Sequence, residues 1–299
     1  MSKQLGFSGH FTLVAVNADT GESRELASFD NLITDIGLER LGSGGAVGFC
    51  HVGSGSAAPV ATNTALASFV ASTALTGSTV SGAQATAPYF GWTRFTYRFA
   101  AGVAAGNLSE IGISWTSTSG NLFSRALIKD SGGTPTTITV LSNEFLDVTY
   151  ELRMYPPTTD STFTTVIGGV TYDCVLRASE VTDGSWAWRP FIVEQGASFA
   201  NPRGNTALAY DGTLGAITAT PSGTGAGLDA TDNAYVANSK SRSAVLSATL
   251  GGANFTGGID VIYFLTRMGT YQVSFNPPIA KDNTKTLAVN AAVSWARRP

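Results

Sequence analysis

Large apolar side chains alternate with polar ones in several stretches of this chain. In residues 93–99, aromatic side chains hold every second position and polar or charged ones stand between them: Phe95, Tyr97 and Phe99 against Arg94, Thr96 and Arg98. Successive side chains of a strand point to opposite faces of a sheet, so this order predicts a strand with one buried face.

Two further stretches extend the pattern. The sequence FLDVTYELR, residues 145–153, alternates in the same way, and its expected core positions are Leu146, Val148, Tyr150 and Leu152. The sequence NLSEIGISW, residues 107–115, carries a second apolar run at Leu108, Ile111, Ile113 and Trp115, behind a turn signal at Gly106 and Asn107. Together they predict an almost wholly β segment up to Tyr155.

The first 75 residues combine a hairpin with helices. Residues 7–17 and 24–29 alternate and flank ADTGES, a turn in which Gly21 tolerates positive φ. A two-turn helix is expected next, capped by Asn31 or Thr34 and ended by Gly42. A second short helix is expected over residues 63–72, capped by Thr62 or Asn63, with its inward side chains at Leu66, Phe69 and Val70.

The double proline at Pro156–Pro157 is the predicted domain boundary, because consecutive prolines stiffen a linker and do not fit inside a central strand. We therefore expect a mainly β chain of two β-sandwich-like domains, residues 1–155 with one or two short helices and residues 156–299. The second domain is expected to open with a hairpin turning at Gly168 and Gly169, and to contain a low-complexity loop over residues 218–233.

The second domain also resembles a diverged duplicate of the first. NTALAS at residue 63 recurs as NTALAY at residue 205, and FLDVTYELR has a looser counterpart in TLAVNAAVSWAR, residues 286–297, both at an offset of ~140 positions. Chance matches in a chain rich in Thr, Ala and Gly are the alternative, and the sequence leaves both open.

Charged residues make up 13% of the 299 positions, about half the usual share in soluble proteins. Interfaces are depleted in Lys, Glu and Asp, so this composition is typical of a chain whose surface is covered by other subunits, although a secreted β protein can share it. The net charge is −3 and no basic block occurs, which argues against nucleic acid as a partner. No apolar stretch reaches the length of a membrane span, and no signal peptide is recognisable.

Motifs for catalysis or cofactors are missing. Cys50 and Cys174 belong to no metal-ligand pattern, and whether they form a disulfide stays open. His10 and His51 have no Gly-x-Ser-x-Gly partner, and the GSGS at residues 53–56 is neither a nucleophile elbow nor a phosphate loop. Asp229, Asp232 and Asn233 do not match a calcium loop. No local acid motif supports a glycosidase. We expect no enzyme, no cofactor and no metal.

The order of these segments resembles a module of bacteriophage tail and tail-fibre proteins. The resemblance covers roughly residues 5–155 and rests on EIGI (110–113), LFSRALI (122–128) and LDVTYEL (146–152), preceded by FDNLITDIGLERLG (29–42) and CHVGSGSAAPVATNTAL (50–66). It implies a virion structural protein, assembled in the host bacterial cytoplasm, that oligomerises with itself and with other tail or virion proteins at the tail tip, baseplate or tail-fibre attachment. Two alternatives are a receptor-binding module for the host surface and a head decoration or collar protein.

The sequence SWAWRPF supplies the candidate surface residues Trp186, Trp188, Arg189 and Phe191. In a strand, Trp186 and Trp188 would share a face. Trp and Arg are enriched at the energetic centres of interfaces, so the group is a candidate interface or surface-recognition patch. Packing of both Trp side chains into the core is the equal alternative, and stacking on a sugar is the lesser one.

Overall fold

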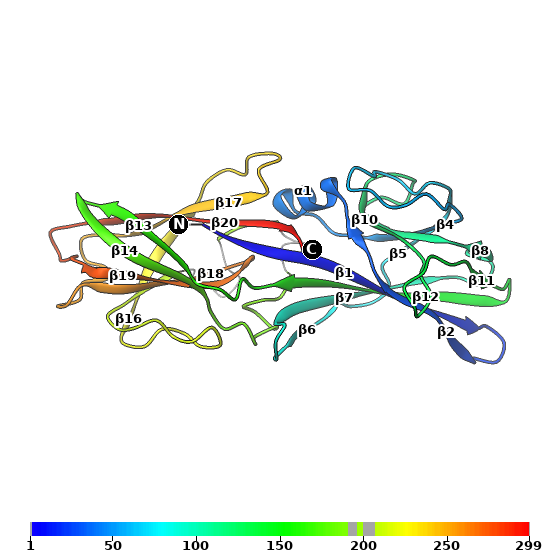
Figure 1. Cartoon of the computed structure of the whole chain (residues 1–299), viewed down its shortest axis with the longest axis horizontal. Helices are drawn as coiled ribbons and strands as arrows, with labels where there is room; N and C mark the ends of the chain where they lie inside the picture. Colours follow the sequence, from blue (N-terminus) through cyan, green and yellow to red (C-terminus); the bar gives the residue numbers. More distant parts are fainter. Residues whose placement is uncertain (1, 191–195, 200–206, 299) are drawn as a thin grey trace.

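The computed structural model describes residues 2–190, 196–199 and 207–298. Strands account for 52% of the chain and helix for 3%, so the prediction of a mainly β fold is confirmed. Figure 1 shows an elongated molecule of two β-rich halves, with the N-terminal strand running through the middle.

Within the described residues, thirteen strands form one sheet that extends through both halves. Twelve follow one another in the order β13 (Ser161–Ile167), β14 (Val170–Ala178), β19 (Gly269–Ile279), β18 (Ile259–Thr266), β15 (Ala207–Tyr210), β16 (Gly225–Asp232), β17 (Ser241–Ala248), β20 (Leu287–Arg297), β1 (Ser2–Asn17), β12 (Glu144–Tyr155), β7 (Phe90–Phe99) and β6 (Val80–Gln84), and β2 (Ser23–Asp30) pairs with β1. The expected hairpins around Gly21 and around Gly168 and Gly169 are present as β1–β2 and β13–β14.

A second sheet covers the inner face of β1, β12 and β7. Its order is β3 (Leu32–Ile33), β10 (Leu122–Leu127), β9 (Glu110–Ser114), β4 (Phe49–Gly53) and β5 (Phe69–Ala74), while β8 (Gly106–Leu108) pairs with β11 (Ile138–Val140). The two sheets meet through aromatic side chains, because the ring centroid of Tyr150 in β12 is 6.5 Å from that of Phe123 in β10. Phe11 of β1 packs beside Tyr150 within the long sheet, at 5.0 Å. The predicted alternation in β7 and β12 is confirmed, because Phe95, Tyr97, Phe99 and the four apolar positions of 146–152 are all buried.

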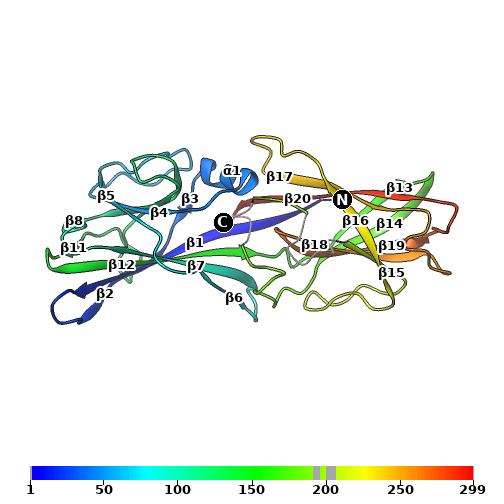
Figure 2. The same cartoon turned by 180° about the vertical axis from the view of Figure 1, so that it is seen from behind.

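The expected boundary near residue 156 falls between β12 and β13, and backbone pairing nevertheless joins the two halves. β1 runs antiparallel to β12 over Gly6–Asn17, and its first residues pair in parallel with β20, Ser2 opposite Ala292 through Phe7 opposite Arg297. Lys3 is buried and its ammonium donates to Ser161 Oγ at 2.8 Å. Figure 2 shows β1 beside β20 and β12 at the centre of the molecule. The internal duplication stays a prediction, and residues 205 and 206 of its second copy lie outside the described residues.

One helix occurs in the described residues, α1 (Asp35–Ser43). Thr34 caps it as expected: its hydroxyl accepts from Gly37 N–H at 2.9 Å and donates to Leu122 O. The helix ends one residue beyond Gly42, where Gly44 has a φ of 79° and its N–H donates to Arg40 O. No helix in the described ranges is long and apolar enough to cross a bilayer.

The second predicted helix, over residues 63–72, is wrong. The segment is an irregular loop followed by β5, with Leu66 buried but Phe69 and Val70 37% and 43% exposed. The cause is the buried carboxylate of Glu110, which accepts hydrogen bonds from Gly55, Ala67 and Ser68 N–H. These bonds satisfy the backbone in an extended form that is incompatible with helical pairing.

Glu110 in turn forms an ion pair with Arg125 at 2.7 Å, and both side chains are at most 2% exposed. Arg125 also donates to Asn63 Oδ1 and Ala57 O. We call the Glu110–Arg125 pair and its bonds to residues 55–68 the loop latch. It fixes a loop that carries little regular structure of its own.

The low-complexity segment at residues 218–233 contains β16, which the sequence did not predict. Its strand pairs with β15 on one side and β17 on the other. Its first three residues, Gly225, Ala226 and Gly227, are all small and give little hydrophobic signal for a strand.

A candidate binding groove on the outer face of the sheet

The solvent side of β7 carries two aromatic residues where polar ones would be expected. Phe90 and Trp92 stand in phase with Arg94, Thr96 and Arg98, opposite to the buried positions of the strand. Both rings are partly exposed. Burial of a large aromatic side chain is the usual outcome, so their position outside the core points to a surface role.

The strand register aligns these residues with side chains of β6, β12, β1 and β2 in four rows across the sheet. The rows are Thr96–Thr149–Thr12–Ser28, then Val80–Arg94–Glu151–His10–Asp30, then Gly82–Trp92–Arg153–Ser8, and last Gln84–Phe90 beside Tyr155–Gly6. From the first row to the last, the side chains change from hydroxyl groups to paired charges and then to aromatic rings.

Short ion pairs and hydrogen bonds hold the charged row together and join it to Arg153 of the next row. Glu151 lies between two guanidinium groups, accepting from Arg94 Nε at 2.7 Å and from Arg153 Nε at 2.6 Å. His10 Nδ1 lies 2.6 Å from Asp30 Oδ1, and its Nε2 lies 2.9 Å from Ser28 Oγ. Burial raises the pKa of Glu151, but the hydrogen bonds from Arg153 and Arg94 outweigh it and hold that pKa below its usual value.

Each arginine also stacks against an aromatic ring. The guanidinium carbon of Arg94 is 4.2 Å from the Trp92 ring centroid, and that of Arg153 is 5.1 Å from the Phe90 ring centroid. Gly82 leaves space for the indole, because a Cβ at this position would lie 2.5 Å from Trp92 Cζ2. Contact with a ring and a carboxylate orients both guanidinium groups before any ligand arrives.

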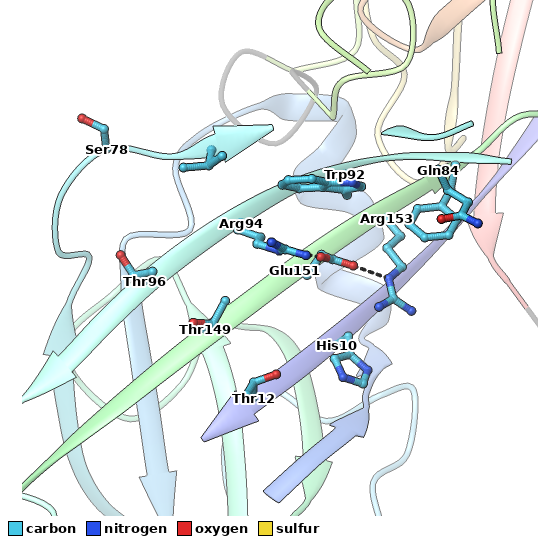
Figure 3. A pocket seen from close by; sticks show the side chains of 12 residues that line it. His10, Thr12, Ser78, Gln84, Trp92, Arg94, Thr96, Thr149, Glu151 and Arg153 are labelled. Carbon is cyan, nitrogen blue, oxygen red and sulfur yellow. Dashed lines mark hydrogen bonds and ion pairs between the residues drawn. The ribbon is translucent and has the colours of Figure 1, made fainter. Parts of the chain in front are cut away.

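The curled face lines an open hollow of about 660 Å³, which we call the outer groove. It is lined by His10, Thr12, Ser78, Val80, Gln84, Phe90, Trp92, Arg94, Thr96, Thr149, Glu151 and Arg153. Figure 3 shows the labelled side chains of β7, β12 and β1 on the same side of the sheet, with Glu151 next to Arg153. Its volume lies within the range of small-ligand sites.

A second hollow of about 410 Å³ adjoins the aromatic end of the groove. Tyr155 links the two, since its ring centroid is 5.1 Å from that of Phe90 and 3.7 Å from the guanidinium carbon of Arg298. Tyr89, Pro156 and Pro157 are among its other lining residues. Alternating aromatic and guanidinium groups thus continue beyond the outer groove.

Of the sequence candidates, Trp186, Trp188 and Arg189 lie elsewhere and are not part of a strand. Trp188 is fully buried, donates from Nε1 to Ser179 O at 2.8 Å and packs edge-on against Tyr271 at 5.6 Å. It is a core residue, so it is no longer a surface candidate. Trp186 is 38% exposed in the preceding turn, and Arg189 is partly exposed. Phe191 lies outside the described residues.

The remaining candidates also have structural partners. Cys50 and Cys174 are free and buried, so no disulfide joins them. His51 is buried and its Nε2 contacts Thr116 O at 2.7 Å. Asp232 belongs to β16 and accepts hydrogen bonds from Ser198 Oγ and Phe199 N–H. No cluster of three metal-ligating side chains occurs in the described part of the chain.

The chain matches no protein-family model, no curated protein and no solved structure. Arguments about function therefore rest on its own residues. The signal for the groove was present in FGWTRF, residues 90–95, where Phe90 and Trp92 share the parity of Arg94. That alternation was sufficient to predict the buried face, but the two aromatic residues on the exposed face were not among the predicted site residues.

Proposed function

We propose that this chain is a structural subunit of a bacteriophage virion, located at the tail tip, baseplate or tail-fibre attachment, and that it oligomerises through exposed sheet edges. The mainly β fold and the low charged fraction of 13% support the proposal. So does the order of segments that resembles tail proteins. The observation that carries it is the β13 edge.

β13 ends the long sheet and, among the described strands, pairs with β14 alone. Its sequence STFTTVI contains no charged residue, and Val166 is 64% exposed. Natural edge strands usually carry Lys, Pro or a bulge that blocks further pairing. None of these devices occurs within the seven residues of β13, whose residues 163 and 165–167 line a hollow together with residues 288–290 of β20, and the proposed contact pairs a strand of another subunit with this edge.

Light scattering coupled to size-exclusion chromatography tests this function with one charged substitution and a matched control. Val166→Lys places an ammonium on the edge, and Val236→Lys places one at a similarly exposed loop position, 67% exposed. We expect the wild type and Val236→Lys to form the same oligomer, and Val166→Lys to dissociate at concentrations at least about tenfold higher. A monomeric wild type, or equal assembly of both variants, would contradict the proposal.

The outer groove favours a second candidate function, recognition of the host surface. Pairing of β-strands between subunits requires neither its oriented arginines nor its exposed aromatic rings. Pull-down with host cells separates the two functions, because a cell-binding chain that blocks infection is a receptor-binding module. A head decoration or collar position remains a variant of the structural function.

A further inference from the structure

We infer that the outer groove binds a neutral saccharide. The inference deepens the second candidate function, and it concerns a different surface from the β13 edge. Its support comes from the balance of charges, the pairing of donors with acceptors, and the position of the aromatic rings.

Charges in and beside the groove cancel. Arg94 and Arg153 are balanced by Glu151 and by Asp30, whose carboxylate is 3.9 Å from Arg153 and 2.6 Å from His10. A groove for nucleic acid or an acidic polymer would carry an excess of positive charge. A balanced groove instead fits a ligand without net charge.

Sugar hydroxyl groups both donate and accept hydrogen bonds, and the groove offers both functions side by side. A guanidinium only donates and a carboxylate only accepts, and here the Glu151 carboxylate lies between Arg94 on the neighbouring strand β7 and Arg153 two residues farther along β12. Arg94 is 49% exposed, so donor groups beyond its bond to Glu151 face solvent. The row of Thr96, Thr149 and Thr12 adds hydroxyl groups at one end.

Phe90 and Trp92 supply the apolar contact that a sugar ring needs for its C–H face. Aromatic side chains combine a large contact area with defined geometry. Both rings are fixed by stacked arginines, so little conformational entropy is lost on binding. The continuation past Tyr155 into the adjoining hollow gives space for further units of a chain.

A panel of neutral hexose and N-acetylhexosamine oligosaccharides, with uronic-acid oligosaccharides and single-stranded DNA as comparisons, tests the inference by calorimetry. We expect binding of at least one neutral oligosaccharide, with an affinity that changes less than about threefold between roughly 50 and 500 mM NaCl, as for an uncharged ligand. No binding to any neutral member, or binding restricted to the anionic probes, would overturn it.

Two substitutions in the groove and one beside it locate the site. Glu151→Gln keeps the side-chain shape and removes the charge that orders both arginines, and Thr149→Trp fills the floor without removing a charged contact. We expect each to weaken binding at least about tenfold. Asp147→Asn, in the neighbouring Arg98–Asp147 pair on the same two strands, is the control and should bind like the wild type.

Unfolding in urea confirms that each variant is folded before its affinity is compared. Saccharide binding unaffected by both groove variants would refute the site. The Val166→Lys variant keeps the two proposals separate, because it should lose assembly and retain saccharide binding. If saccharide binding fails while Val166→Lys still lowers assembly, the structural function stands without the groove.

Discussion

Replacing Glu110 by Gln perturbs the loop latch most directly, because the side chain keeps its shape and loses one acceptor oxygen and its charge. Oε1 accepts from Gly55 and Ser68 N–H at 3.0 and 2.7 Å, and Oε2 accepts from Ala67 N–H and from Nε and Nη2 of Arg125. A glutamine at this position carries an NH₂ group in place of one of these oxygens. In either orientation of the amide, that NH₂ group would face the N–H donors that now bond to the carboxylate.

The expected loss of folding stability follows from the buried charge of Arg125, which the substitution leaves without its anionic partner. Arg125 is 2% exposed and would lose its anion. Breaking a buried ion pair by removing one partner costs about 3–5 kcal/mol, a large part of a typical stability of about 5–15 kcal/mol. Asp147→Asn removes the partner of the half-exposed Arg98 and should cost less than about 1 kcal/mol.

Urea unfolding measures both variants, and hydrogen exchange of the Ala67 and Ser68 amides reports on the latch itself. We expect those amides to lose protection in Glu110→Gln. The double variant Glu110→Gln/Arg125→Met should be less destabilised than the sum of its single variants, because no buried charge remains. A cost below about 1 kcal/mol, or full protection of both amides, would refute this account of the loop.

The stability lost in Glu110→Gln should also depend on pH. Burial raises the pKa of Glu110, but hydrogen bonds from Ser68, Ala67 and Arg125 outweigh it and hold the pKa below its usual value of 4.5. A carboxylate with a depressed folded-state pKa stabilises the protein above its unfolded pKa, and this contribution is lost as the pH falls through the folded value. The stability difference between wild type and Glu110→Gln should therefore narrow below pH 4.5.

Two smaller predictions follow from the same structure. Thr34→Ala removes the helix cap to Gly37 and the bond to Leu122 O, and should lower the free energy of unfolding by about 1–2 kcal/mol in urea. Cys50 and Cys174 are buried, and burial raises the pKa of both thiols, so a thiol reagent should modify neither in the folded chain and both after denaturation. Rapid labelling of either native thiol would contradict their placement.

Local pattern was sufficient for the strands that have one face in the core. β7 and β12 were predicted because their apolar residues alternate strictly, and α1 because Asn31 or Thr34 offered a cap and Gly42 an end. The segment at residues 63–72 has helical spacing at Leu66, Phe69 and Val70, and that preference lost to hydrogen bonds from a carboxylate far along the chain. A single sequence contains no signal for such a distant partner.

The groove shows the same limit in a different form. Alternation within β7 alone places Phe90 and Trp92 on the face opposite to the core. That Arg94, Glu151 and His10 form one row requires the register between β7, β12 and β1, which are far apart in sequence. Trp186 and Trp188 attracted attention through residue type alone, and residue type does not separate a core side chain such as Trp188 from a surface one.

The two proposed surfaces are compatible because they belong to opposite ends of the long sheet. β13 stands first in the strand order, whereas the groove lies on β6, β7, β12 and β1 at the other end. Figure 1 shows the β13–β14 hairpin far from β6 and β7. We therefore expect an oligomer joined by pairing of β13 with β13 to leave each groove uncovered. In such an assembly, several grooves would raise the effective concentration of sites along a repeating saccharide, and weak single contacts would combine into avidity gains of about 10²–10⁴ without any new contact.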